Sequence, residues 1–248
     1  MDINKLEKSL DGVKVIYLRE VNSTNVYARE NKIKSDSIVI AEKQTAGKGR
    51  LSHNWESEPG KDLTFTIVKE IQIDIKKAFI MNFYVSLMLT GTLQEYGNVN
   101  LKWPNDIMFC GKKVCGILTE TEAKGELIKY YIGIGINLNR DKFQESLKDK
   151  ATSMKIICNN VLDREEIFVK IIKNFFKNIE MLNEPDKVLD GWKKYFYLKE
   201  KTIMFKVNDT GDEVTARVLD VDSDGGIILM SMNGEKIKHY AGEISFIY

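Results

Sequence analysis

The chain has 248 residues, enough for one large domain and a small one. Lys and Arg (37) nearly balance Asp and Glu (36), so the bulk charge gives no reason to expect nucleic-acid binding. Three cysteines and two histidines, without the paired spacing of zinc ligands, argue against a structural metal or a disulfide framework and favour a reducing cytoplasm.

Apolar periodicity divides the first 138 residues into strands and helices. Strands are predicted at 15–21, 37–42, 63–69 and 129–138, a strand and hairpin within 99–121, and helices over 26–31 and 78–93. The helix over 78–93 is shorter than the roughly 20 apolar residues of a membrane span, and polar residues interrupt it, so we interpret it as a core helix. The pattern predicts an α+β fold in which a mixed β-sheet packs on helices.

The second part of the chain begins with a helix start and ends in short strands. Asp163 and Glu166 form a capping-box pattern before apolar residues with helical spacing up to Leu182, and Pro185 opens a second predicted helix that ends at Tyr195. After Leu198, glycine turns separate strands predicted at 202–207, 213–221, 226–232 and 236–240. We therefore predict two domains, 1–198 and a small β-barrel over 199–248.

A glycine-spaced basic loop, Gln44 to Trp55, follows the strand predicted at 37–42. Its two glycines allow close approach of the backbone to a ligand, and Lys48 and Arg50 add positive charge, so the loop is suited to an anion. The spacing matches neither a Walker A loop nor a dinucleotide fingerprint.

Four clusters occur in one order along the chain. They are Ser23-Thr24-Asn25, the loop from Gln44 to Trp55, Lys102-Trp103-Pro104-Asn105-Asp106, and Lys113 to Leu118 followed by Gly133 to Asn137. With the small terminal barrel, they resemble the biotin protein ligase family, in the form lacking an N-terminal DNA-binding domain. The resemblance covers about residues 14–248 and implies a class II synthetase-like catalytic domain with an SH3-like barrel.

The resemblance implies a reaction and a set of site residues. Enzymes of the family adenylate biotin with ATP and Mg²⁺ and attach the biotin to a lysine of a biotin carboxyl carrier domain of a carboxylase. It assigns biotin contacts to Ser23, Thr24, Asn25, Gln44, Lys48, Gly49, Arg50 and Lys113, with Lys113 and Arg50 catalytic. It assigns the nucleotide to Lys102, Trp103, Asn105, Asp106, Asn137 and Trp55, with Asp106 also the metal ligand.

The chemistry of the residues agrees with that assignment. A ureido ring needs neutral polar groups, whereas a carboxylate attacking a phosphorus needs positioned cations and no side-chain nucleophile. One of the clusters departs from the family pattern at two positions: in the loop, Lys48 and His53 stand where arginines are common, and neither offers the planar fork of arginine.

Several alternatives stay open on the sequence alone. Lys48 and His53 are compatible with a non-catalytic biotin-binding regulator, and the related lipoate or octanoate ligases are a second alternative. A nucleic-acid reading rests only on the basic loop and the terminal barrel, and we expect neither DNA nor a membrane as a partner. Only about a dozen residues precede the first predicted strand, which leaves no room for a helix-turn-helix. The dimers common in the family make a homodimer one alternative.

Overall fold

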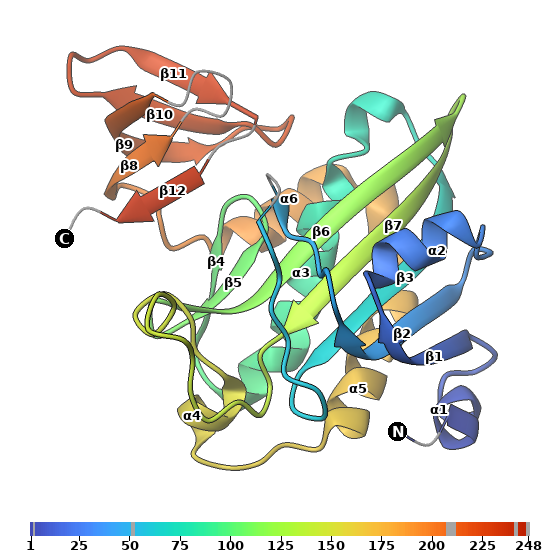
Figure 1. The fold of residues 1–248 in the computed structure, drawn as a ribbon. Coiled ribbons are helices and arrows are strands. Elements are labelled where there is room, and N and C mark those ends of the chain that lie inside the picture. Colours follow the sequence, from blue (N-terminus) through green and yellow to red (C-terminus); the bar gives the residue numbers. More distant parts are fainter. Residues whose placement is uncertain (2, 51–52, 207–211, 241–242, 247–248) are drawn as a thin grey trace.

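The computed structural model describes residues 1, 3–50, 53–206, 212–240 and 243–246. A seven-stranded mixed sheet forms the larger part, with its strands in the order β1-β2-β3-β7-β6-β5-β4 (Figure 1). The strands are β1 Lys14–Val21, β2 Ser37–Gln44, β3 Leu63–Gln72, β4 Val99–Lys102, β5 Asp106–Phe109, β6 Lys112–Lys124 and β7 Leu127–Ile136. Only β1 and β2 pair in parallel among these described strands. The predicted α+β fold with a mixed sheet is confirmed.

Most helices cover one face of this sheet, behind it in the view of Figure 1. The helices are α1 Ile3–Ser9, α2 Thr24–Glu30, α3 Ile80–Leu93, α4 Met154–Cys158, α5 Arg164–Lys177 and α6 Pro185–Lys193, with 3-10 turns at Ile75–Lys77, Gln94–Tyr96 and Ile179–Asn183. No helix in the described part of the chain is long and apolar enough to cross a bilayer.

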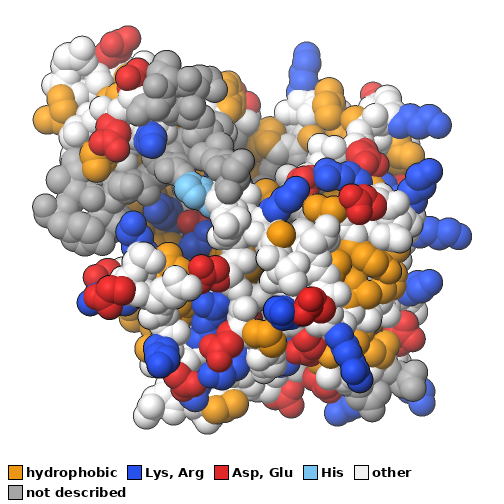
Figure 2. Space-filling view, viewed as in Figure 1, with side chains coloured by type: hydrophobic (Ala, Val, Ile, Leu, Met, Phe, Trp, Pro, Cys, Tyr) orange, Lys and Arg blue, Asp and Glu red, His pale blue; other side chains and the backbone are white. Residues whose placement is uncertain are grey.

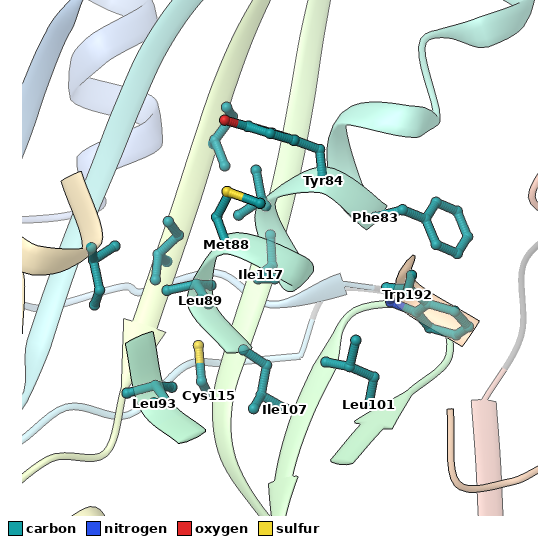
Figure 3. Close-up of a cluster of buried hydrophobic side chains, with 14 of the residues drawn as sticks. Phe83, Tyr84, Met88, Leu89, Leu93, Leu101, Ile107, Cys115, Ile117 and Trp192 are labelled. Carbon is teal, nitrogen blue, oxygen red and sulfur yellow. The ribbon is translucent and has the colours of Figure 1, made fainter. Parts of the chain in front are cut away.

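Helix α3 lies at the centre of the main core. Figure 3 shows its side chains from Phe83 to Leu93 packed toward Ile107, Cys115 and Ile117 of the sheet and Trp192 of α6. Its buried hydroxyls donate to carbonyls one turn earlier, Ser86 to Asn82 at 2.7 Å and Thr90 to Ser86 at 2.8 Å. These bonds satisfy the polar groups and let a mixed sequence serve as a core helix.

The helix α2 covers the opposite face of the sheet. Along β2, Ile38 and Ile40 belong to the main core, while Val39 between them packs with Ala28 of α2 in a second, smaller cluster. Because successive side chains of a strand point to opposite faces, β2 is buried on both sides. The first residues of α2, Thr24 and Asn25, lie over the middle of this sheet, within hydrogen-bond distance of Thr66 of β3 and the Leu118 carbonyl of β6.

The C-terminal residues form a separate five-stranded antiparallel sheet in the order β11-β10-β9-β8-β12. Its strands are β8 Thr202–Lys206, β9 Glu213–Val221, β10 Ile227–Ser231, β11 Lys236–His239 and β12 Glu243–Phe246. The main hydrophobic core continues into it without a break, since Phe205 and Trp103 pack at 6.4 Å between ring centroids. The boundary between 198 and 199 stays a prediction.

The structure differs from the predicted elements in several places. The stretch 99–121 contains three strands, because the chain turns at 103–105 as well as at Gly111. Helices α1 and α4 and strand β12 were not predicted, and the helix starting at Arg164 ends at Lys177 before a 3-10 turn. The capping by Asp163 is confirmed, since its carboxylate accepts from the N–H groups of Glu165 and Glu166.

Candidate active site

One cavity of about 280 Å³ gathers the four sequence clusters over the β6–β7 face of the sheet. Its lining includes Ser23, Thr24, Asn25, Gln44, Lys48, Gly49, Arg50, Trp55, Lys102, Trp103, Asn105, Asp106 and Lys113. His53, Gly116, Gly133 and Gly135 also contribute. Of the predicted site residues only Asn137 lies outside this lining.

Asn137 has a different place in the structure. Its side-chain amide donates to the carbonyl of Thr152 at 3.2 Å, and its backbone N–H donates to that of Val114. The residue is 5% exposed. In this arrangement Asn137 fastens the chain after β7 to the loop at 151–153, and its predicted contact with the nucleotide stays a prediction.

Two glycines make a flat slot in the floor of the cavity. Gly116 of β6 and Gly135 of β7 are directly opposite each other in the ladder, and the ring of Trp55 lies against both. A Cβ on Gly135 would come 2.2 Å from Cε2 of Trp55, and one on Gly116 would come 2.9 Å from Cζ3. Side chains are therefore excluded at both positions, which accounts for the glycines better than ordinary strand packing does.

The indole nitrogen of Trp55, Nε1, is buried in the slot without a hydrogen bond to any described residue. The ammonium of Lys113 stands 5.5 Å from the ring centroid. The structure shows the Trp55 ring packed onto the cavity floor, and its predicted contact with the nucleotide stays a prediction.

Neutral polar groups line the end of the cavity nearest α2. The Gln44 Oε1 accepts from the Thr24 N–H at 2.8 Å and so caps α2, whereas the Ser23 hydroxyl makes no capping bond to this helix. Thr66 of β3, fully buried, lies 2.6 Å from Asn25 Oδ1 and 2.8 Å from the Thr24 hydroxyl. The result is a connected network of uncharged donors and acceptors.

The amide of Asn25 joins this network to the sheet. Its nitrogen lies within hydrogen-bond distance of the Leu118 carbonyl at 3.2 Å and of the Glu120 carboxylate at 2.8 Å. A Cβ on Gly133 would stand 2.6 Å from Asn25 Oδ1, so Gly133 makes room for this amide. Thr66 and Glu120 were not predicted as site residues.

A β-bulge turns Lys113 toward the cavity. Opposite β5, Ile107 pairs with Cys115 and Met108 with Lys113, which leaves Val114 as the extra residue. In a regular strand Lys113 and Gly116 would point to opposite faces, but here the Lys113 Nζ would lie 3.1 Å from a Cβ on Gly116. Neighbouring Lys112 instead reaches the exposed carbonyl of Lys148 at 2.7 Å.

Lys113 forms an ion pair inside the site. Its Nζ lies 2.6 Å from Oδ1 of Asp106, with the side chains 32% and 19% exposed. The nearby Cys115 is fully buried, and burial raises the pKa of its thiol, so it is not a nucleophile. The pair places a cation and a carboxylate side by side in the lining of the cavity.

The turn from Trp103 to Asp106 carries residues that were predicted to contact the nucleotide. The Asn105 amide nitrogen donates to the Ile117 carbonyl at 2.5 Å, and its Oδ1 lies 3.5 Å from Nη1 of Arg50. The Asn82 amide of α3 donates to the Pro104 carbonyl at 2.6 Å. Asn82 was not predicted, because a single polar residue in an apolar helix gives no sequence signal of this contact.

The basic loop folds back on itself. Trp55 donates its N–H to the Gly47 carbonyl at 2.8 Å, and Gly49 donates to that of His53 at 2.7 Å. A Cβ on Gly47 would be 2.5 Å from the Trp55 carbonyl oxygen, so glycine is needed for this closure. Residues 51 and 52 of the predicted loop lie outside the described residues.

A buried ion pair fixes the chain where this loop ends. Arg140 Nε donates to Asp62 at 2.6 Å, and its Nη2 donates to the carbonyl of Glu56, the residue after Trp55. Burial raises the pKa of the Asp62 carboxyl, while Arg140 and two backbone N–H groups favour its charged form. Neither residue was predicted to support the site.

The fold and the cavity define a member of the biotin and lipoate ligase class. A sequence profile described as the Biotin/lipoate A/B protein ligase family matches residues 17–137. The bifunctional ligase/repressor BirA of Bacillus subtilis (strain 168) is 30% identical over 251 residues, which cover 96% of this chain and 76% of BirA. The chain belongs to the biotin protein ligase family.

Other relatives agree with this membership. BirA of Escherichia coli (strain K12) is 27% identical over 243 residues, covering 95% of this chain and 75% of that protein. The biotin protein ligase from Aquifex aeolicus in complex with biotin and ATP superposes with a TM-score of 0.78 at 26% identity, covering 94% and 97% of the two chains. The resemblance inferred from the motifs is thereby confirmed.

Proposed function

We propose that the protein adenylates biotin with ATP to give biotinyl-5′-AMP and then transfers biotin to a lysine of a biotin carboxyl carrier protein. One observation carries the proposal: Lys113 from β6 and the loop residues Lys48 and Arg50 line one cavity whose other end is neutral and polar. Such a cavity suits a molecule with a ureido ring at one end and a carboxylate at the other.

The polar network gives the proposed orientation of biotin. The ureido group would face Ser23, Thr24 and Gln44, where an unpaired polar group would be costly and a matched one is selective. The chain of biotin would run along the glycine slot, and its carboxylate would reach Lys113. Because Asp106 is the partner of Lys113 in the structure, an anionic ligand competes with this carboxylate for the ammonium.

The first step joins two anions. A carboxylate oxygen of biotin attacks the α-phosphorus of ATP, a P–O bond to the β-phosphate breaks, and pyrophosphate leaves. Lys113 and Arg50 offset the charge that develops on the phosphorus oxygens, which is worth about a hundredfold in rate for one donor. In the second step the amine of the carrier lysine attacks the acyl carbonyl and AMP leaves.

The donors beside Lys113 fit Mg²⁺ held chiefly by phosphates. Asp106 supplies a carboxylate, and Mg²⁺ usually keeps several waters and binds through only one or two carboxylates. Within the described residues no three His, Cys, Asp or Glu side chains gather into a complete cage. A bound Mg²⁺ would offset charge on the polyphosphate, and Asp106 and Asn105 would orient that end of the nucleotide.

The experiment is hydroxamate trapping with ATP and either biotin or lipoate. We expect a biotin-dependent product and pyrophosphate, both lost in Lys113→Ala, and transfer of labelled biotin to a carrier domain. A lipoate-dependent product would favour the lipoate or octanoate alternative, and biotin binding without product would favour the regulator.

Two other predictions have separate tests. Figure 2 shows Lys and Arg side chains interspersed with Asp and Glu on the visible face, which does not favour DNA. DNA retention that falls steeply with salt would support the nucleic-acid reading. Light scattering after size exclusion tests the homodimer, and the cytoplasmic location stays a prediction.

A further inference from the structure

Three side-chain hydrogen bonds connect the turn from Trp103 to Asp106 to three different parts of the fold. Asn82 of α3 donates to the Pro104 carbonyl, and Asn105 donates to the Ile117 carbonyl of β6. The third bond connects the turn to the C-terminal sheet: the indole Nε1 of Trp103 donates to the Gly225 carbonyl at 3.0 Å. Gly225 lies in the turn between β9 and β10 of the C-terminal sheet.

Trp103 is buried between the two sheets. It is 2% exposed, and its ring packs against Phe205 of β8, which in turn lies 4.7 Å from the ring of His239 on β11. The Trp103 side chain therefore packs against the C-terminal sheet, although the residues before and after it line the cavity. Sequence alone assigned this tryptophan to the nucleotide.

The acceptor of the indole bond is itself held in place. Gly225 has φ +82°, a conformation that favours glycine, and its N–H donates to the Asp222 carbonyl at 2.9 Å. A Cβ on Gly225 would stand 2.5 Å from Cδ2 of Phe79, the residue before α3. The β9–β10 turn therefore packs closely against Phe79 at the start of α3. This contact and the bond to Asp222 hold the Gly225 carbonyl in place.

We propose that Trp103 is a positioning residue through which the C-terminal sheet sets the place of Asn105 and Asp106. The inference rests on the proposed function, since it concerns the nucleotide end of that site. Asp106 follows Trp103 by three residues and pairs with Lys113, so a shift of the turn moves the Asp106 carboxylate relative to the Lys113 ammonium. A misplacement of about 1 Å costs on the order of a hundredfold in rate.

The test separates positioning from core filling. Trp103→Phe keeps an aromatic ring and removes the N–H, and we expect the KM for ATP to rise about tenfold while the KM for biotin stays within about twofold. Trp192→Phe is the matched control, because Trp192 is 1% exposed and packs on Phe83 and Phe196 within the catalytic part. It should lower the unfolding temperature without changing the ratio of the two KM values.

A second variant reaches the same bond from the other side. Gly225→Ala leaves Trp103 in place and displaces the acceptor, because the new methyl meets Phe79, and we expect the same ATP-selective rise. Circular dichroism establishes that each variant is folded, and if Trp103→Phe is not, Gly225→Ala decides. Unchanged ATP kinetics in the folded variants, or equal rises for both substrates, overturn the coupling. No biotin-dependent pyrophosphate from the wild type overturns the proposed function itself.

Discussion

Gly135→Ala puts the glycine slot to a direct test. The new Cβ would stand 2.2, 2.4 and 2.6 Å from Cε2, Nε1 and Cζ2 of Trp55. Carbon atoms pack at about 3.5–4.0 Å, so the indole has to move by more than about 1 Å. We expect kcat/KM for biotin to fall about a hundredfold, because the displaced ring carries the end of the basic loop with it. Overpacking should cost about 1–3 kcal/mol of stability.

The position of Trp55 can be measured by its fluorescence. Trp103 and Trp192 are 2% and 1% exposed, so a red shift in the emission of Gly135→Ala would report the half-buried Trp55, and subtraction of the Trp55→Phe spectrum would isolate it. Gly133→Ala is the matched control, because its Cβ would meet the amide of Asn25 rather than Trp55. The role of the slot would be refuted if Gly135→Ala kept the wild-type emission and biotin kinetics. An equal emission shift in Gly135→Ala and Gly133→Ala would refute it as well.

Three further changes test the charges and the polar network. Lys113→Met should reduce biotin-dependent pyrophosphate release about 100- to 1,000-fold with little change in unfolding temperature, and an equal loss in Lys112→Met would contradict the assignment. Thr66→Val should raise the KM for biotin about tenfold and leave that for ATP unchanged in steady-state assays. Burial raises the pKa of Glu42, but Arg164 outweighs it and holds the pKa below 4.5. Its stabilisation is therefore present above about pH 4.5 and lost as pH falls through the lowered pKa. Thermal unfolding should show the wild type more stable than Glu42→Gln at about pH 7, and this difference should shrink as the pH falls through the lowered pKa.

Local pattern was sufficient for most of the fold. Period-two and helical spacing located most strands of the large sheet and helices α5 and α6, and α3 was predicted as a core helix because its sequence is apolar on nearly all sides. Helix α1 has only seven residues and no acidic first turn, so it gives little signal. The hairpin predicted within 99–121 was expected to turn near Gly111, and the second turn at 103–105 was not assigned, although Pro104 and Asn105 are common turn residues and gave a local signal for it.

The sequence predicted the cavity residues that lie in rare motifs. It did not predict the residues that support them from other parts of the chain. Lys113, Arg50 and Asp106 belong to distinctive runs, and all line the cavity. Asn82 and Arg140 act through bonds to backbone carbonyls far along the chain, which no local spacing encodes. Thr66 had a usable signal, since it is a polar residue between Phe65 and Ile67 in a strand buried on both faces.

The bulge in β6 makes the direction of the Lys113 side chain depend on the strand register as well as on residue identity. If Val114 were paired as an ordinary ladder residue, Lys113 would stand three residues before Gly116 in a regular strand and would face away from it. Comparisons of this region between relatives must therefore respect the irregular register before equating lysines. A designer who transplants the site to another sheet must carry the extra residue along with the side chains.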